Sequence, residues 1–497
     1  MVPSTRRELR PARLAALLVL GLALGFAASW TAGCSLVNSF GDVVPQKETP
    51  VDGSSGTDGV APATDGSTEE GAPAESGADA TADASDASDA SDTGDGGVET
   101  SVDASARGAV VIGGTAALDG GEGFVLTALD PTTGTELPQA RETMTVSAVL
   151  YDGSRDLWYV FESGGQGIFP LPTDPFWVHT RQLDVVTGAW TELGKVAIPA
   201  GLSFATTTVE AQRVSYVAYG QGSGAPADGG IPSAFGLVTL DTSDPANVSV
   251  SSVVQLTASP IALVGTRSSV NAAGGFATLA ATTSAGGTNV AQLTPVLLPS
   301  SSPPSEEAPI VGTVAVGGQT GFGLVRVSGV EGVAVVARGN GTTSATLSIY
   351  NPAANSPAQA FLGAGTFPFG DSNVKAPAFS DCSGTVFVVG TNSDLNVYAV
   401  PLAPTLVPAA DGGAAAVTAV SAPTGHSGQG VYFEPYTNTV LVPFSQGDNF
   451  ALTAYTFAGG QLVARQAPRW VPPADLRPNF IATRSPVPFD CSLAADF

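Results

Sequence analysis

The chain has 497 residues, among them 60 glycines and 37 prolines, and only 13% of its residues are charged. This composition excludes coiled coils and long helical bundles and favours many short strands joined by turns. The 44 acidic residues outnumber the 19 lysines and arginines, and the formal net charge of −25 argues against nucleic acid as a partner. Because there are only two histidines, three cysteines and two methionines, we expect no metal, no cofactor and no catalytic residue.

The first 34 residues have the three-part layout of a secretion signal. Four arginines between residues 6 and 13 precede an apolar run over residues 14–28, and small residues then lead to Cys34. The run is short for a membrane helix, which needs about 20 apolar residues. A plain signal peptide, an uncleaved membrane helix and a twin-arginine signal at Arg6-Arg7 are the alternatives.

The segment Thr31-Ala32-Gly33-Cys34 resembles the bacterial lipobox. The resemblance implies that residues 1–33 are a signal peptide, that Cys34 receives diacylglycerol, and that residues 34–47 are a lipidated N-terminal segment. Thr31 departs from the family pattern, which prefers leucine there. The cysteine is followed by Ser35 rather than aspartate, which in lipoproteins goes with sorting to the outer membrane. The protein is then expected on either the periplasmic or the cell-surface side of the outer membrane.

Residues 48–107 are predicted to be a disordered acidic linker rich in Asp, Ala, Ser and Gly. Residues 48–106 hold 15 acids and no lysine, arginine or aromatic residue, so they bury too little apolar surface to offset the entropy of ordering. A flexible chain of this length has an end-to-end distance on the order of 40 Å. The alternative, a calcium site at the DASDASDASD run, lacks the EF-hand pattern.

Residues 108–497 repeat one pattern, namely a short apolar strand, a turn rich in glycine or polar residues, and a second strand. The first strand of the pattern occurs seven times, and its later copies are 57, 62, 57, 53 and 54 residues apart, measured at Leu157, Val214, Phe276, Val333, Val386 and Val440. A further apolar segment precedes six of the seven copies. The first copy lacks it, whereas the segment NFIATRSPV at 479–487 has no copy to follow it, so we expect this C-terminal strand to complete the first unit.

Seven four-stranded units with interlocked ends resemble a β-propeller, in which each blade buries both faces against its neighbours. The expected fold class is therefore all-β, a seven-bladed β-propeller over residues 108–497, although six or eight blades are alternatives. The string LDVVTGAW at 183–190, with the Gly113-Gly114 and Gly164-Gly165 pairs, is similar to kelch-type repeats. An outer-membrane barrel is a competing fold, but an aromatic content of 7% is low for its girdles.

Few residues offer chemistry in this domain. His179 and His426 fall in different units and are interpreted as surface or packing residues. Arg267, Arg326 and Arg484 all lie near the ends of predicted innermost strands, where three guanidinium groups can converge on a carboxylate or phosphate. The alternative is that these three arginines are solvated turn residues.

Cys382 and Cys491 are the two cysteines left once Cys34 is lipidated. Export places them in an oxidising compartment, where a remaining pair tends to bond. The repeat alignment also places each cysteine just after an innermost strand, on the same face and near the axis. The sequence therefore predicts a disulfide between them.

Two functions fit these observations. The first is a monomeric, membrane-tethered β-propeller of the cell envelope that binds or scaffolds a protein, peptide or glycan without catalysis, since loops vary freely on a rigid scaffold. The second is a secreted hydrolase or lyase that uses channel residues. The sequence does not support naming an enzyme.

Overall fold

The computed structural model describes most of the chain beyond residue 106. The described residues are 107–118, 121–163, 176–198, 202–210, 213–220, 235–256, 262–267, 274–285, 288–299, 305–306, 310–315, 322–327, 332–338, 343–351, 357–370, 374–390, 396–402, 418–421, 427–428, 430–446, 449–465, 470–485 and 489–493. The predicted signal, Cys34, the acidic linker and His426 lie outside them.

The described residues are almost entirely β-structure, arranged as antiparallel sheets of four or five strands. Sheet 1 comprises β1 (Val110–Leu118), β2 (Gly121–Leu129), β3 (Glu142–Thr143) and β30 (Arg477–Thr483). Sheet 2 comprises β4 (Val146–Asp152), β5 (Leu157–Ser163), β6 (Phe176–Leu183) and β7 (Trp190–Ile198). Sheet 3 comprises β8 (Leu202–Glu210), β9 (Arg213–Gly220), β10 (Phe235–Asp241) and β11 (Ser249–Gln255).

The later sheets repeat this plan. Sheet 4 comprises β12 (Ala262–Arg267), β13 (Gly274–Ala285), β14 (Thr288–Pro299), β15 (Ser305–Glu306) and β16 (Ile310–Ala315), and sheet 5 comprises β17 (Phe322–Val327), β18 (Gly332–Arg338), β19 (Ser344–Tyr350) and β20 (Phe361–Pro368). Sheet 6 comprises β21 (Ala378–Ser380), β22 (Thr385–Val389), β23 (Asn396–Pro401) and β24 (Thr418–Ser421). Sheet 7 comprises β25 (Ser427–Gly428), β26 (Tyr432–Glu434), β27 (Thr439–Gln446), β28 (Asn449–Ala458) and β29 (Gln461–Ala464).

Helix is scarce in the described part of the chain. It holds the four-residue helix α2 (Pro357–Ala360) and the single 3₁₀ turn η2 (Cys491–Leu493). In the residues that the structure describes, no helix reaches the length and hydropathy of a membrane span. The all-β class expected from the composition is therefore found.

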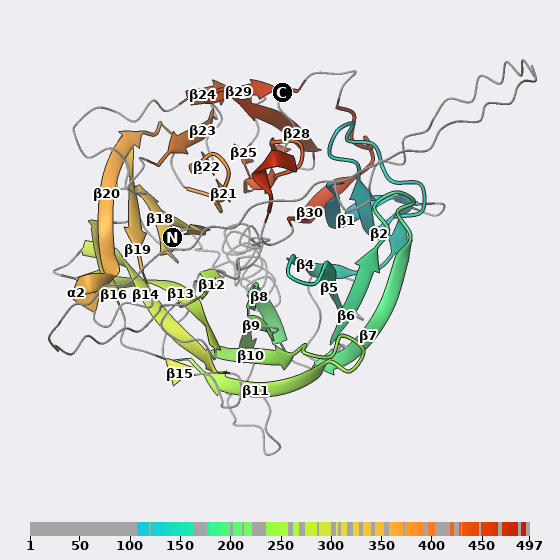
Figure 1. The fold of residues 1–497 in the computed structure, drawn as a ribbon, viewed down its shortest axis with the longest axis horizontal. Helices are drawn as coiled ribbons and strands as arrows, with labels where there is room; N and C mark the ends of the chain where they lie inside the picture. Colours follow the sequence, from blue (N-terminus) through green and yellow to red (C-terminus); the bar gives the residue numbers. More distant parts are fainter. Residues whose placement is uncertain are drawn as a thin grey trace, which may run out of the picture. The chain divides into compact units, whose positions relative to one another are not determined.

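The first strands of successive sheets lie side by side at their inner edges (Figure 1). In chain order β4 lies beside β8, β8 beside β12, β12 beside β17, β17 beside β21, and β21 beside β26, while β30 lies beside both β4 and β26. Successive sheets thus pack against one another through these strands. The sheets follow one another in the order of the sequence colours in Figure 1.

The C-terminal strand joins the first sheet, which is the pairing that the unmatched segment 479–487 predicted. β30 runs antiparallel to β1, from Val110 opposite Thr483 to Thr115 opposite Arg477, with a register shift between Gly113 and Gly114. A Cβ at Gly114 would lie 2.2 Å from the carbonyl oxygen of Arg477. Gly114 therefore serves the close approach of two backbones at an irregular point of the ladder, whereas Gly113 leaves room for the Val146 side chain.

Strand β1 shows how the core is divided between neighbouring sheets. Val110 and Ile112 belong to a buried cluster with Leu441 of sheet 7, whereas Val111 belongs to a cluster with Val149 of sheet 2. This is the two-residue period of a strand with an apolar layer on each face. Burial of each such aliphatic side chain contributes about 1.5–3 kcal/mol, so both faces of the sheet stabilise the fold.

Candidate functional site

The turn from the first to the second strand has the same design in sheets 2, 6 and 7. It spans Asp152–Asp156, Ser380–Gly384 and Glu434–Asn438, and in each turn a side-chain oxygen of the first residue accepts a backbone N–H of the turn. The fifth residue has a left-handed backbone in all three, with φ of 53°, 61° and 48°. This repeated turn brings acidic side chains to one end of the inner strands.

Arg484, directly after β30, is the centre of the polar cluster at that end. Its Nε and Nη2 donate to the two carboxylate oxygens of Asp156 at 2.9 and 2.8 Å, and Nη1 donates to the carbonyl oxygen of Arg107 at 2.5 Å. Nη1 also lies 3.5 Å from the hydroxyl of Tyr436, whose ring faces the guanidinium. Arg484 is 5% exposed, so its donors are directed at groups of the chain itself.

The Asp156 carboxylate is the partner that balances this buried charge. Burial opposes its ionisation, but hydrogen bonds from Arg484 and from the Tyr151 hydroxyl, at 2.7 Å, outweigh burial and lower the pKa of Asp156. Burial likewise opposes the charge of Arg484, and the hydrogen bonds to Asp156 reverse that effect and raise its pKa. A bidentate pair of this kind links sheet 2 to the C-terminal strand of sheet 1.

Glu434, at the end of β26, is fully buried. One carboxylate oxygen accepts the Tyr436 N–H at 3.2 Å, and the other accepts the N–H and hydroxyl of Thr437 at 2.9 and 2.6 Å. Burial raises the pKa of Glu434 to about 7, against the opposing hydrogen bonds of Thr437 and Tyr436 and the charge of Arg465. A Cβ at Gly108 would lie 2.1 Å from its Oε1, so the chain enters sheet 1 directly against this carboxyl.

Asp381, next to the first cysteine, has a different environment. The residue is exposed to solvent, yet desolvation by the surrounding protein raises the pKa of its carboxyl, an effect that the charge of Arg326 partly offsets. Arg326, at the end of β17, is 8% exposed.

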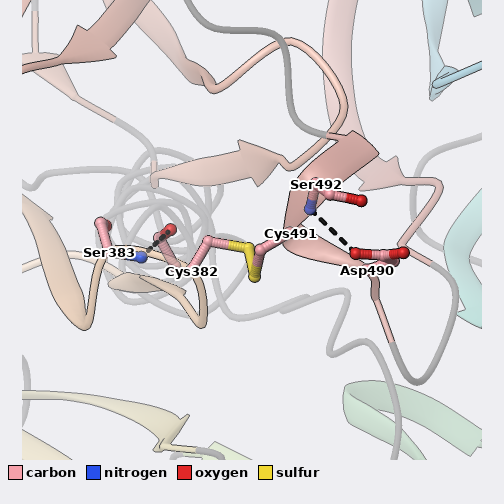
Figure 2. The surroundings of a disulfide bond; sticks show 6 residues. Cys382, Ser383, Asp490, Cys491 and Ser492 are labelled. Atoms are coloured by element: carbon pink, nitrogen blue, oxygen red, sulfur yellow. Dashed lines mark hydrogen bonds between the residues drawn. A yellow bond between two sulfur atoms is a disulfide. The ribbon is translucent and has the colours of Figure 1, made fainter.

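The structure joins Cys382 and Cys491 in a disulfide, as the sequence predicted, with a Cα–Cα distance of 5.5 Å. Cys382 lies in the turn after β21, and Cys491 opens the turn η2 beyond β30. Figure 2 shows Ser383 beside the first cysteine and Asp490 and Ser492 beside the second. The bond therefore ties the C-terminal segment to sheet 6.

The three arginines singled out in the sequence have different surroundings. Arg484 pairs with Asp156, and Arg326 lies near enough to Asp381 to influence its ionisation. Arg267 ends β12, where its backbone is paired with Gly275, but its side chain lies outside the described residues. The convergence of all three guanidinium groups on one anion thus stays a prediction.

His179 lies within β6, 3% exposed, between two glutamates. Its Nδ1 is 2.8 Å from Glu192 and its Nε2 is 2.8 Å from Glu162, while Arg181 pairs with Glu192 at 3.4 Å. Both ring nitrogens thus face carboxylate oxygens, which tie β6 to its neighbours β5 and β7. His179 is thus a buried packing residue, one of the two interpretations that the sequence allowed.

Other polar contacts between sheets gave no signal in the sequence. Arg155, in the turn of sheet 2, donates to the carbonyl and hydroxyl oxygens of Thr242 after β10. Arg465, after β29, donates to the carbonyl oxygens of Pro131 in sheet 1 and Thr437 in sheet 7, at 2.9 and 3.2 Å. A pattern repeated along the chain predicts the contacts within one unit, but it does not predict which side chains meet between units.

Within the described part of the chain, no three or more His, Cys, Asp or Glu side chains are grouped to hold a metal ion. The residues at the inner-strand ends are carboxylates, guanidinium groups and tyrosines that pair with one another. Such a set can bind a polar partner through Asp381 and the exposed half of Asp156. A buried carboxyl with a raised pKa, such as Glu434, is also able to exchange a proton near neutral pH.

The sequence matches no protein-family model and no curated protein. Among solved structures, it is similar to a putative 6-phosphogluconolactonase from Bacteroides uniformis, with 12% identity, a TM-score of 0.49, and coverage of 76% of this chain and 99% of the other. A periplasmic gluconolactonase from Pseudomonas aeruginosa has 13% identity and a TM-score of 0.45, and the match covers 74% of this chain and 98% of the other. A β-propeller domain from Myceliophteria thermophila has 11% identity and a TM-score of 0.38, and the match covers 67% of this chain and 91% of the other. With TM-scores below 0.5, these similarities add nothing to the fold, which follows from the strand pairing.

Proposed function

We propose that this chain is an exported, lipid-anchored, seven-bladed β-propeller that acts as a non-catalytic binding or scaffolding module for a protein, peptide or glycan. The observation that carries the proposal is the pairing of polar groups at the inner-strand ends. Arg484, Asp156 and Tyr151 hold one another, and Glu434 is held by its own turn. These groups stabilise the scaffold, which leaves recognition to exposed groups such as Asp381.

The proposal of seven closed blades rests on the order of the inner strands. Each first strand lies beside the next, and β30 lies beside both β4 and β26. Because β30 also pairs with β1, the two ends of the domain meet in sheet 1. A closed arrangement leaves no inner sheet face without a neighbour and holds the loops on a rigid support.

Anchoring through Cys34 is proposed from the lipobox-like segment and the acidic linker. Mass spectrometry of the mature protein tests it, since the chain is expected to begin at Cys34 with acyl groups attached. Cys34→Ser is expected to release the protein from the membrane fraction. An intact residue 1–33 segment, or a mature N-terminus elsewhere, would show that the anchor is absent.

The binding role is tested with the full-length protein on a glycan array and in chemical cross-linking on intact cells. Molecules bound saturably are then eluted and analysed by mass spectrometry. The proposal expects a partner that is recovered chemically unchanged. A partner recovered cleaved, or with an elimination product, would contradict a non-catalytic role.

One observation favours the alternative of a secreted hydrolase or lyase. Asp381 combines a raised pKa with access to solvent and a neighbouring arginine, which are the properties of a general acid. Asp381→Asn separates the two functions when the wild type and the variant are compared on a panel of ester, lactone and glycoside substrates. A wild-type activity that the variant lacks would favour the enzyme.

A further inference from the structure

The C-terminal strand is held in sheet 1 without help from the disulfide. β30 is paired with β1 along its length, and the Thr483 hydroxyl donates to the carbonyl oxygen of Phe433 at 2.8 Å. Arg484 adds its hydrogen bonds to Asp156 and to the backbone of Arg107. The disulfide, which begins seven residues after Arg484, is therefore not what closes sheet 1.

What the disulfide holds is the segment Phe489–Leu493, termed here the C-terminal tail. Phe489 packs its ring edge-on against Tyr436, with ring centroids 5.0 Å apart. The following residues form one 3₁₀ turn with a hydrogen bond from the Leu493 N–H to the carbonyl oxygen of Asp490. A single turn has little stability of its own, so the covalent bond to Cys382 is the main constraint on the tail.

Both cysteines are exposed to solvent, and so is the turn that contains Cys491. An incoming thiolate needs access along the sulfur–sulfur bond, and exposed disulfides are the ones that exchange readily. Tyr436 is only 4% exposed, and Phe489 and Arg484 both lie against its ring. Loss of the tail would uncover one side of this ring.

We propose that Cys382–Cys491 is a thiol–disulfide exchange site whose reduction by a dithiol frees the C-terminal tail and uncovers Tyr436, while the β30–β1 pairing stays intact. In the first step a thiolate of the dithiol attacks one sulfur, forming a mixed disulfide and releasing the other cysteine as a thiolate, which takes up a proton. In the second step the remaining thiol of the dithiol attacks the mixed disulfide. The dithiol becomes a disulfide, and both cysteines end as thiols.

The two possible roles of the disulfide differ in which segments loosen when it is reduced. A disulfide that closes the sheet would, on reduction, loosen β30 and β1 together with the tail. A bond that holds only the tail leaves both strands protected. The distinction does not depend on the partner or on the anchor proposed above.

The test is hydrogen–deuterium exchange of the full-length protein, with and without dithiothreitol as the dithiol. Alkylation of the cysteines followed by mass spectrometry shows that reduction under native conditions is complete. We expect at least about tenfold faster exchange in peptides covering 489–493, and unchanged exchange in peptides covering 110–118 and 477–483. Cys491→Ser is expected to give the reduced pattern without dithiothreitol, and Phe489→Ala with the disulfide intact is the matched control that removes only the ring contact.

Three results would each overturn the proposal. The first is a disulfide that resists dithiothreitol in the folded protein. The second is a tail that keeps its protection after both cysteines have been alkylated. The third is a loss of protection in β1 and β30 along with the tail, which would make the bond a staple of sheet closure instead.

Discussion

Replacement of Glu434 by glutamine isolates the effect of a fully buried carboxyl where sheet 7 meets sheet 1. Glutamine has nearly the same shape and keeps one oxygen for the donors of Thr437, as the protonated acid does. It cannot ionise. The Glu434→Gln variant therefore keeps the site uncharged at every pH, and its amide nitrogen, which cannot accept the Tyr436 N–H, changes stability by the same amount at every pH.

The expected magnitude follows from the pKa of the carboxyl. Burial raises the pKa of Glu434 from 4.5 to about 7. A group that binds its proton more tightly in the folded chain contributes stability that is complete below about pH 4.5 and is lost as the pH rises through about 7. At 1.36 kcal/mol for each pKa unit, wild-type protein loses about 3 kcal/mol of unfolding free energy between about pH 4 and pH 8 through this group.

The assay compares urea unfolding of wild type and Glu434→Gln by tryptophan fluorescence at several pH values and constant ionic strength. All other carboxyls are shared, so they cancel in the difference. We expect the variant to gain about 3 kcal/mol on the wild type from about pH 4 to pH 8. Glu122→Gln, at an exposed glutamate paired with Arg477, is the control and is expected to change stability by less than about 1 kcal/mol. Parallel pH profiles for wild type and Glu434→Gln would refute the reasoning.

Two further substitutions test the polar cluster and the turns. Asp156→Asn removes the charge that balances the buried Arg484 guanidinium and is expected to lower the free energy of unfolding by about 3 kcal/mol; a loss below about 1 kcal/mol in urea unfolding would show that the pair is not needed. Gly134→Ala is expected to cost more than Gly384→Ala, by about 1 kcal/mol or more. Both glycines have left-handed φ, but only at Gly134 would a Cβ meet Trp470, at 2.8 Å; equal melting temperatures would contradict this.

The strands were predictable because they carry the repeat. The repeat positions Leu157, Val333 and Val440 lie at or one residue after the first residue of β5, β18 and β27. The unmatched segment 479–487 likewise contains most of β30. The strands of one unit mostly follow one another in the sequence, so the repeat was enough to predict which strands pair.

The kelch-like string at 183–190 forms a turn between two strands. In LDVVTGAW, Asp184 accepts the N–H groups of Val186 and Thr187, and Gly188 has φ of 79°. The same turn occurs at Asp130, with Gly134 in the corresponding place. Turn chemistry between two strands explains the shared Asp and Gly, and the kelch subfamily stays a prediction.

The arginines show the opposite difficulty. In the sequence, Arg484 lies at the end of a predicted innermost strand, and it was therefore a candidate to bind an external anion. In the structure, Asp156 occupies its guanidinium, although 328 residues separate the two along the chain. Nothing local to either residue predicts that pairing, because it exists only once the two ends of the domain have met.

This junction explains why charge gathers where it does. Between successive sheets the chain is continuous, but in sheet 1 the two ends of the domain meet through the pairing of β1 with β30 and through side chains. Arg465 reaches from sheet 7 to the turn of sheet 1, Arg484 fixes the end of β30 to Asp156, and the Glu434 turn packs on Gly108. Charged hydrogen bonds are stronger and more directional than apolar contacts, and they set the register of two segments that no short connection holds together. Assembly of the scaffold therefore accounts for Arg465, Arg484 and Glu434 at this end of the inner strands, whereas Asp381 and the exposed half of Asp156 stay in contact with solvent.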